Sequence, residues 1–328
     1  MNIIPIAFAF DNNLTMPAAV AFTSLLKNAA PETFYDIYIL HSEKEELDKF
    51  LFSKIVEEFH KCKINYVPVG NTFEGAFEIR EITTPTYYRL LIPKLIPQYD
   101  KIIYADVDIT FRLDLSDLYS IDLGSNYLAA TKDLGSILTE DGRNHVKTLP
   151  DVNPDNYLQA GFIMLNSALI RQDGLIDKFV EVAAKKWKFQ DQDTLNIVCH
   201  DRVLFLEPKY NMTDYSFYFY YGTKDHSEWN ELYTIEQFKE GEKCGNLHFN
   251  GHKPWKKWSV NFDIWWEYYR MSPAFDEEFY FNFYYNRLNE LDQLPLMKRI
   301  KLLVRYFISP PQWYLKLSTF INNSFHKS

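Results

Sequence analysis

Glycine and cysteine are both scarce in this chain. Glycine accounts for only 11 of the 328 residues, which disfavours a phosphate site built as a glycine-rich loop. The three cysteines, Cys62, Cys199 and Cys244, are odd in number and far apart in the sequence. They therefore indicate neither a disulfide framework nor a zinc site, and they are typical of a protein that works in a reducing cytosol.

Long hydrophobic runs are absent too, because no apolar stretch approaches the roughly 20 residues that a transmembrane helix needs. Residues 1–10 are apolar, but no basic segment precedes them and Pro5 interrupts them. We interpret them as a first strand and not as a signal peptide. Hydrophobic residues make up 47% of the chain and aromatic residues 17%. One large α/β domain with an appendage can therefore bury a sizeable core.

Positive charge is concentrated at the C-terminal end. Residues 296–328 hold six basic residues and no acid, so they contribute +6 to a net charge of −9 and leave −15 for the remainder. An acidic body argues against nucleic acid as the main partner. The basic and aromatic tail favours an anionic surface instead.

Strand and helix signals alternate along the first part of the chain. We expect strands at 3–10, 34–40 and 64–68, a helix over 17–28, and a second helix that follows a Ser42-x-x-Glu45 capping box and runs to Lys61. This βαβαβ pattern predicts a parallel, doubly wound half. Further strands are expected at 101–105, 127–130, 162–165 and 203–206, and helices at 86–91, over 167–187, from Gln190 and from Asp263 onward.

Two carboxylates directly follow the fourth expected strand. Residues 101–105 form a short apolar run, typical of a buried parallel strand, and Asp106-Val107-Asp108 comes next. Ligands of open α/β sheets bind outside the carboxyl ends of strands. In extended chain, residues two apart point to one face, so Asp106 and Asp108 can converge on one divalent cation. In the alternative, one aspartate caps the next turn and the other is solvated.

The segment from His248 to Trp255 carries residue types that complement these acids. A histidine at a strand end can complete a metal site begun by two carboxylates, and mixed oxygen and imidazole ligands suit manganese or magnesium. Lys253 follows Gly251 closely and can neutralise a phosphate as a point charge. In the alternative, His248 is a core histidine and Lys253 a surface lysine.

Six short motifs, in order over roughly the first 257 residues, resemble those of glycosyltransferase family 8. This family comprises retaining enzymes that include bacterial lipopolysaccharide galactosyl- and glucosyltransferases and glycogenin. The matching segments are Ala9-Phe10-Asp11-Asn12-Asn13, Tyr87-Tyr88-Arg89-Leu90, Tyr104-Ala105-Asp106-Val107-Asp108, Gln159-Ala160-Gly161, Gln190-Asp191-Gln192-Asp193 and His248 through Trp255. Any one of these motifs is weak, but six in the family's order form a specific pattern.

The resemblance implies a GT-A fold, in which a Rossmann-like mixed α/β sheet binds a nucleotide between flanking helices. From the pattern of residues along the chain we expect a catalytic domain over 1–257 and a helical extension with a basic, aromatic tail over 258–328. By resemblance, the metal ligands are Asp106, Asp108 and His248, and the metal is manganese, with magnesium as the alternative. The donor-binding positions are Ala9, Asp11, Asn13, Arg89, Asp106, Val107, Asp108, Asp133, Gln159, Ala160, Gly161, Asp191, Gln192, His248, Gly251 and Lys253.

The implied reaction moves galactose or glucose from a UDP-hexose to a saccharide, glycolipid or glycoprotein. A departing nucleoside diphosphate needs a cation and a lysine. Gln192 resembles the residue beneath the anomeric carbon, and because an amide is a poor nucleophile we favour same-face substitution, with Asp191 as the alternative carboxylate. Two positions depart from the family: Leu14 stands where many members stack an aromatic on uracil, and Gln159 where many have Asn.

Two competing interpretations remain at this point. Asp106-Val107-Asp108-Ile109-Thr110 also resembles the signature of haloacid-dehalogenase-like phosphatases, in which Asp106 would be a nucleophile and Asp108 a general acid. That family places its motif on the first strand, whereas several elements precede Asp106 here. The second alternative is a non-catalytic carbohydrate-binding protein, with the aromatic run 217–221 as a sugar platform or as core.

Two loops and the tail carry further expectations. We expect 71–84 and 245–255 to close over the donor. Leu296, Ile300, Leu303 and Phe307 form one helical stripe flanked by basic residues, the pattern of an interfacial helix on anionic lipid. We therefore expect a cytoplasmic protein that is peripheral on the inner face of the cell membrane. In the alternative, the stripe packs on the acidic body.

Overall fold

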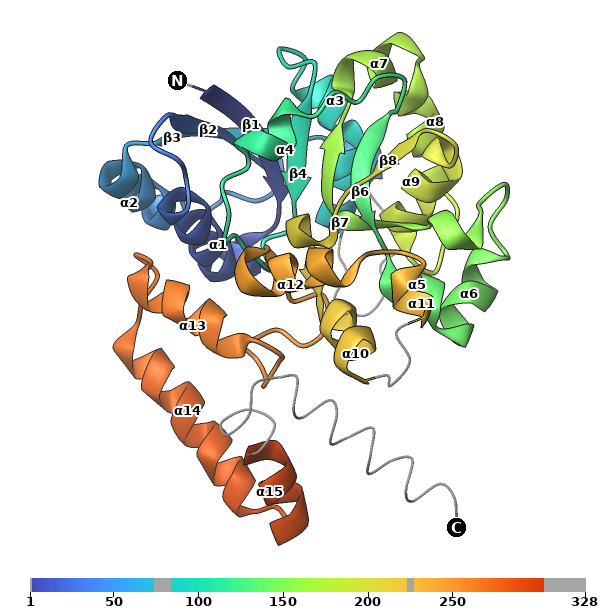
Figure 1. Ribbon diagram of the computed structural model, residues 1–328. Coiled ribbons are helices and arrows are strands. Elements are labelled where there is room, and N and C mark those ends of the chain that lie inside the picture. The colour runs from blue at the N-terminus through green and yellow to red at the C-terminus, as the bar shows by residue number, and fades with distance from the viewer. Residues whose placement is uncertain (1, 74–83, 223–226, 304–328) are drawn as a thin grey trace.

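A seven-stranded sheet forms the centre of the computed structural model, which describes residues 2–73, 84–222 and 227–303 (Figure 1). The strand order is β3-β2-β1-β4-β7-β6-β8. β7 runs antiparallel to β4 and β6, and the other pairings are parallel. This mixed sheet confirms the predicted fold class. The strands are β1 (Asn2–Ala9), β2 (Thr33–Ser42), β3 (Cys62–Val69), β4 (Ile102–Ala105), β6 (Leu128–Lys132), β7 (Leu158–Leu165) and β8 (Val203–Phe205).

Alternation along the strands separates two hydrophobic cores. Ile6 and Phe8 of β1 belong to the core beneath α1 (Thr15–Lys27) and α2 (Phe50–Phe59). Ala7, between them, belongs to the core on the opposite face. The helices of that face are η3 (Thr84–Leu91), α3 (Ile92–Leu95), α7 (Ser167–Gln172), α8 (Leu175–Ala183) and α9 (Gln190–Cys199). Both faces of the parallel part are thus covered, which explains its continuous apolar strands.

A second, three-stranded sheet lies beside the first and has the order β5-β10-β9. β5 (Ile109–Thr110) follows β4 after two acids, β9 is Met212–Thr213, and β10 is Leu247–His248. β10 pairs antiparallel with β5 and parallel with β9. This small sheet brings three segments that are distant in the sequence to the end of β4.

Helices occupy the described chain from Phe262 onward, where helices were expected from Asp263. α13 (Phe262–Met271) packs on α1, and α14 (Glu277–Asp292) and α15 (Leu296–Leu303) project beyond the body (Figure 1). The remaining helices are η1 (Asn12–Leu14), η2 (Asn71–Phe73), α4 (Ser116–Ser120), α5 (Leu134–Leu138), α6 (Glu140–Val146), η4 (Pro154–Asn156), η5 (Pro208–Tyr210), α10 (Asp214–Gly222), α11 (Ser227–Asn230) and α12 (Ile235–Cys244). Within the described residues, every helix is too short or too polar to cross a membrane.

The predicted capping box at Ser42 is wrong. β2 continues to Ser42, which still pairs with Val69, and α2 does not begin until Phe50. Sheet pairing holds the chain extended at Ser42, so its side chain cannot cap a helix there. The Glu45 carboxylate instead accepts a hydrogen bond of 2.9 Å from the Asn12 backbone.

One further expected element needs correction. The single helix expected over 167–187 is two helices, because Gly174 adopts a left-handed conformation with φ of 67° and interrupts it. The polar segment 135–156 contains α5, α6 and η4. The aromatic run 217–221 lies in helix α10, with most of its rings buried. Of the expected closing loop 71–84, residues 74–83 lie outside the described part of the chain, as do Phe307 and the rest of the tail from residue 304.

Candidate active site

Asp106 and Asp108 lie at the carboxyl end of β4, as predicted, but on a turn. The Asp106 backbone N–H donates to the Gly161 carbonyl of β7 at 2.8 Å. The chain then turns, and the Ile109 N–H donates back to the Asp106 carbonyl at 3.3 Å. The two acids therefore converge because of this turn. Their predicted convergence is confirmed, but the predicted extended conformation is wrong.

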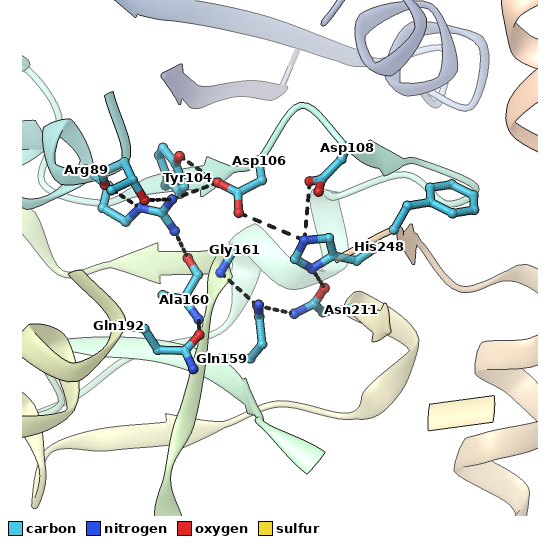
Figure 2. Close-up of polar contacts among 12 residues, drawn as sticks. Arg89, Tyr104, Asp106, Asp108, Gln159, Ala160, Gly161, Gln192, Asn211 and His248 are labelled. Atoms are coloured by element: carbon cyan, nitrogen blue, oxygen red, sulfur yellow. Dashed lines mark hydrogen bonds and ion pairs between the residues drawn. The ribbon is translucent and has the colours of Figure 1, made fainter. Parts of the chain in front are cut away.

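His248 reaches the two acids through the small sheet. It pairs with Ile109, the residue after Asp108, and the Phe249 N–H donates to the Asp108 carbonyl at 3.0 Å. One ligand atom from each of Asp106, Asp108 and His248 lies within 4.8 Å of the others. His248 Nε2 is 3.3 Å from Asp108 Oδ1 and 3.9 Å from Asp106 Oδ2 (Figure 2).

The donor set of this cluster fits a hard divalent cation. Among the residues that the structure describes, no group hydrogen-bonds to the buried Oδ1 of Asp108. An unpaired buried oxygen of this kind is costly unless a cation satisfies it. Burial acts to raise the pKa of the Asp108 carboxyl, but the adjacent Lys253 ammonium holds that pKa below its usual range. Two carboxylates and one imidazole are suitable ligands for manganese or magnesium.

Arg89 joins the metal cluster to a second pair of residues. Its guanidinium is buried between two acids, 2.8 Å from Asp106 Oδ1 and 3.0 Å from Asp191 Oδ2. It also donates to the Ala160 carbonyl at 2.6 Å and lies over the ring of Tyr104, whose hydroxyl donates to Asp106 at 2.7 Å (Figure 2). Burial acts to lower the pKa of Arg89, but the two acids outweigh it and raise the pKa above its usual value. Arg89 and Tyr104 therefore hold Asp106 through its Oδ1, and its Oδ2 faces His248.

Asp191 and Gln192 begin α9, as predicted. Asp191 accepts a hydrogen bond from the Thr86 hydroxyl at 2.8 Å as well as the ion pair from Arg89. Burial raises the pKa of Asp191 to about 6, because the loss of hydration outweighs the opposing effects of Arg89 and Thr86, and the negative charge of Asp106 adds to the rise. Gln192 accepts from the Ala160 N–H at 3.0 Å and donates to Asp133 at 3.3 Å. Burial also raises the pKa of Asp133, the N-cap of α5.

Gln159, Ala160 and Gly161 lie inside β7 and not before it. Their strand is antiparallel to β4, so Gly161 lies directly across from Asp106. The Gln159 side chain is buried, with its amide oxygen accepting from the Gly161 N–H at 2.7 Å. This central strand therefore carries predicted site residues between the metal cluster and α9 (Figure 2).

Lys253 lies beside the acids and not on the open surface. Its ammonium contacts the Asp108 carboxylate and donates to the Phe249 carbonyl at 2.9 Å. Burial acts to lower the pKa of Lys253, but Asp108 outweighs it and the pKa is raised. Gly251 approaches Asp214 so closely that an added Cβ would lie 2.7 Å from Oδ2 of that residue.

The predicted nucleotide-binding residues follow the neighbouring strand β1. Ala7 pairs with Tyr104, which places Ala9 at the same end of the sheet as Asp106. Asp11 accepts a hydrogen bond of 3.0 Å from the Asn13 N–H and caps η1. The side chain of Val107 packs into the core beneath α1, so only its backbone can face a ligand.

Sequence reasoning missed three residues of the site. Thr86 and Tyr104 flank predicted residues and hydrogen-bond to Asp191 and Asp106. Asn211 precedes β9, and its side-chain oxygen lies 3.0 Å from His248 Nδ1. Tyr104 stood within a recognised motif, but no sequence pattern marked Asn211, because only the pairing of β9 with β10 brings it to His248.

Comparison with known proteins decides the family. The model of the family described as Glycosyl transferase family 8 matches residues 5–259. The chain belongs to glycosyltransferase family 8. A protein of Haemophilus influenzae, named provisionally as a glycosyltransferase, is 29% identical over 65% of this chain and 63% of its own length. The lipopolysaccharide 1,3-galactosyltransferase of Salmonella typhimurium is 24% identical over 78% of this chain and 74% of its own length.

Solved structures of the family share the fold. An active-site mutant of LgtC superposes with a TM-score of 0.67 at 23% identity, covering 84% of this chain and 98% of that chain. LgtC in complex with donor and acceptor sugar analogues superposes with a TM-score of 0.63 at 22% identity, over the same shares of the two chains. The family 8 fold places Asp106 after the fourth strand of a GT-A sheet. The phosphatase interpretation of Asp106 is therefore wrong.

Proposed function

We propose that this family 8 enzyme is a retaining hexosyltransferase that moves galactose or glucose from a UDP-hexose to a saccharide, glycolipid or glycoprotein. One observation carries the proposal: Asp106, Asp108 and His248 converge within 4.8 Å with Lys253 in contact with Asp108. Three ligands and an adjacent ammonium are what a nucleoside diphosphate leaving group requires. Names of relatives such as lipopolysaccharide 1,3-galactosyltransferase support a hexose as the transferred group.

Asp106, Asp108 and His248 would hold a manganese or magnesium ion, which when bound supplies positive charge to the diphosphate. Lys253 adds a second positive charge on the side of Asp108. Its Nζ can turn from Asp108 to a phosphate oxygen, because both are anionic acceptors. Ala9, Asp11 and Asn13, at the end of β1, would contact the nucleoside, with uridine as the proposed base despite Leu14.

We assign the sugar to the polar residues around α9 and β7. Arg89, Asp133, Asp191 and Gln192 form one hydrogen-bonded set with the backbone of Ala160. The two carboxylates of this set are already engaged, Asp191 by Arg89 and Asp133 by the Ser136 N–H at 2.7 Å. That engagement favours same-face substitution over a covalent intermediate. The acceptor oxygen bonds to the anomeric carbon as the bond to the diphosphate breaks, and a diphosphate oxygen takes the acceptor proton.

A panel of nucleotide sugars with manganese tests the donor. Without an acceptor, a UDP-hexose should be hydrolysed slowly to UDP and free hexose, while other nucleotide sugars should react less. No turnover of any donor, together with calorimetric binding of a nucleoside diphosphate, would favour a non-catalytic carbohydrate-binding protein. Phosphate release from a phosphomonoester would contradict the transferase chemistry.

The helical extension over 258–328 is proposed to bring the cytoplasmic enzyme to an anionic membrane surface. On α15, the side chains of Leu296 and Met297 are 67% and 75% exposed, and Ile300 is 44% exposed. Lys298, Arg299 and Lys301 lie on the same helix, which has no acid. Of the described stripe residues, Leu296 and Ile300 are exposed and Leu303 is half-buried. The exposure of Leu296, Ile300 and the neighbouring Met297 supports the interfacial interpretation over packing on the acidic body.

A further inference from the structure

One backbone N–H fixes the polarity of a buried hydrogen-bond chain that ends at His248. The Gly161 N–H can only donate, and it points at an amide atom of the Gln159 side chain at 2.7 Å. That atom must therefore be the oxygen of Gln159. The assignment rests on a main-chain donor, whose direction does not depend on how either amide is turned.

The next amide in the chain is then determined as well. The Gln159 oxygen lies 2.8 Å from the side-chain amide of Asn211, which must present its NH₂ group there. The same NH₂ group is 3.2 Å from the Thr131 hydroxyl. Asn211 consequently turns its oxygen toward His248 Nδ1, at 3.0 Å.

The imidazole must meet this oxygen with a proton on Nδ1. In the neutral ring the other nitrogen, Nε2, then carries a lone pair. Nε2 is the atom that faces Asp108 Oδ1 at 3.3 Å and Asp106 Oδ2 at 3.9 Å. These three atoms all carry lone pairs and converge on one point. A cation bound there would stabilise them, whereas the proton on Nδ1 lies on the other side of the ring and cannot.

We infer that Asn211 is a positioning residue that selects the Nδ1–H tautomer of His248, so that Nε2 is available to a divalent cation, and that Gln159 fixes the orientation of Asn211. The inference rests on the metal role in the proposed function. Asn211 and His248 are each 2% exposed and Gln159 is 7% exposed, so water does not compete for these bonds. Groups behind metal ligands commonly set ligand orientation and metal affinity in this way.

This arrangement also gives Gln159 a use that differs from a sugar contact. Its oxygen is occupied by the Gly161 N–H and the Asn211 amide, both on the side of His248. Glutamine, which is longer than the asparagine of many family members, therefore reaches inward at position 159 and supports the predicted metal ligand His248. Figure 2 shows the continuous path from Gly161 through Gln159 and Asn211 to His248.

Nitrogen-15 NMR of the metal-free protein tests the tautomer directly. In spectra that show the ring of His248 with a single proton, long-range ¹H–¹⁵N correlations should place that proton on Nδ1 in the wild type. Asn211→Leu, which keeps the volume but removes the acceptor, should give a mixture of tautomers or the Nε2–H form. The Nε2–H form in the wild type would overturn the inference.

Manganese binding in the presence of UDP, followed by electron paramagnetic resonance of the free ion, supplies the second readout. Asn211→Leu should weaken manganese binding roughly 10- to 100-fold, whereas Asn211→Asp, which keeps an acceptor at Nδ1, should restore most of it. Thr131→Val is the matched control, because it removes another partner of Asn211 and leaves the acceptor in place. Equal affinities in wild type and Asn211→Leu, with both folded, would overturn the inference.

The two readouts separate this inference from the proposed function. A wild type that binds no manganese would refute the metal role, yet the tautomer measurement would still decide what Asn211 does. Normal manganese binding by the wild type with an unchanged tautomer in Asn211→Leu would leave the metal role intact and refute the role of Asn211.

Discussion

Gly161 leaves no space for a side chain beside His248. A Cβ atom added at Gly161 would lie 2.3 Å from Cε1 of His248 and 2.6 Å from Asp106 Oδ2. Neither neighbour can move freely, because His248 is held by Asn211 and Asp106 by Arg89 and Tyr104. Glycine is required here by the close approach of two predicted metal ligands, and not by backbone conformation.

Gly161→Ala should therefore weaken manganese binding and abolish transfer. The added methyl group displaces His248 or Asp106, and overpacking of this kind typically destabilises a protein by about 1–3 kcal/mol. Gly70→Ala is the control, because its nearest neighbour would be 3.7 Å away in ordinary contact. Manganese titration and thermal unfolding measure both effects. Unchanged manganese affinity in Gly161→Ala would contradict this account of the site.

Asp108→Asn should leave the fold intact and remove activity. The change keeps the size of the side chain but lowers its charge, and Oδ1 of Asp108 has no hydrogen-bond partner among the described residues that the fold would lose. Asp173→Asn, which disturbs an ion pair with Arg202 away from the cluster, should retain activity. Hydrolysis of the UDP-hexose with and without EDTA is the measurement. Full activity in EDTA would exclude the metal role.

Lys253→Ala should lower the turnover number by about 10²- to 10³-fold, the usual loss for one group that stabilises developing negative charge. The change also removes the contact of Lys253 with Asp108, so stability should fall, but far less than turnover does, because the Lys253 side chain is 26% exposed. Lys209→Ala serves as the control, since it removes ion pairs with Glu207 and Glu240 outside the site. Single-turnover assays with circular dichroism separate chemistry from folding. An unchanged turnover number would remove Lys253 from the site.

Local patterns in the sequence predicted the sheet and the strand ends that carry acids. They did so because buried parallel strands are short, apolar and followed by polar residues, as at 102–108. The patterns failed at Ser42, where strand pairing overrides a capping motif, and at Gly174, where one backbone conformation divides a helix. The roles of Asn211 and Thr86 could not be predicted from the sequence, because their contacts depend on which distant segments pair.

Asp191 should make the free energy of unfolding depend on pH, and Asp191→Asn should remove this dependence. Burial raises its pKa to about 6 in the folded protein, whereas an unfolded aspartate titrates near about 3.9. Between these values the folded chain keeps a proton that the unfolded chain has released. The contribution of Asp191 to the free energy of unfolding therefore falls as the pH rises through this window.

Asp191→Asn is neutral at every pH and should gain stability relative to the wild type as the pH rises through the same window. Urea unfolding of both proteins across and above this window provides the comparison. A difference in the free energy of unfolding that stays constant with pH would show that Arg89 keeps Asp191 ionised throughout.

The α14–α15 end of the chain should bind anionic lipid. Exposed apolar side chains occur on α14 as well as on α15, since Tyr285 is 65% and Leu288 50% exposed. A basic residue near an anionic bilayer contributes about 1 kcal/mol, so the full chain should co-sediment with anionic vesicles and bind neutral ones weakly. Met297→Glu with Ile300→Glu, and separately a chain ending before Leu296, should lose this binding. Both changes should leave donor hydrolysis in solution unaffected, because α15 lies outside the site. If the variants bind anionic vesicles as the wild type does, or if the wild type binds neither kind, the exposed stripe is not a membrane contact and the peripheral assignment fails.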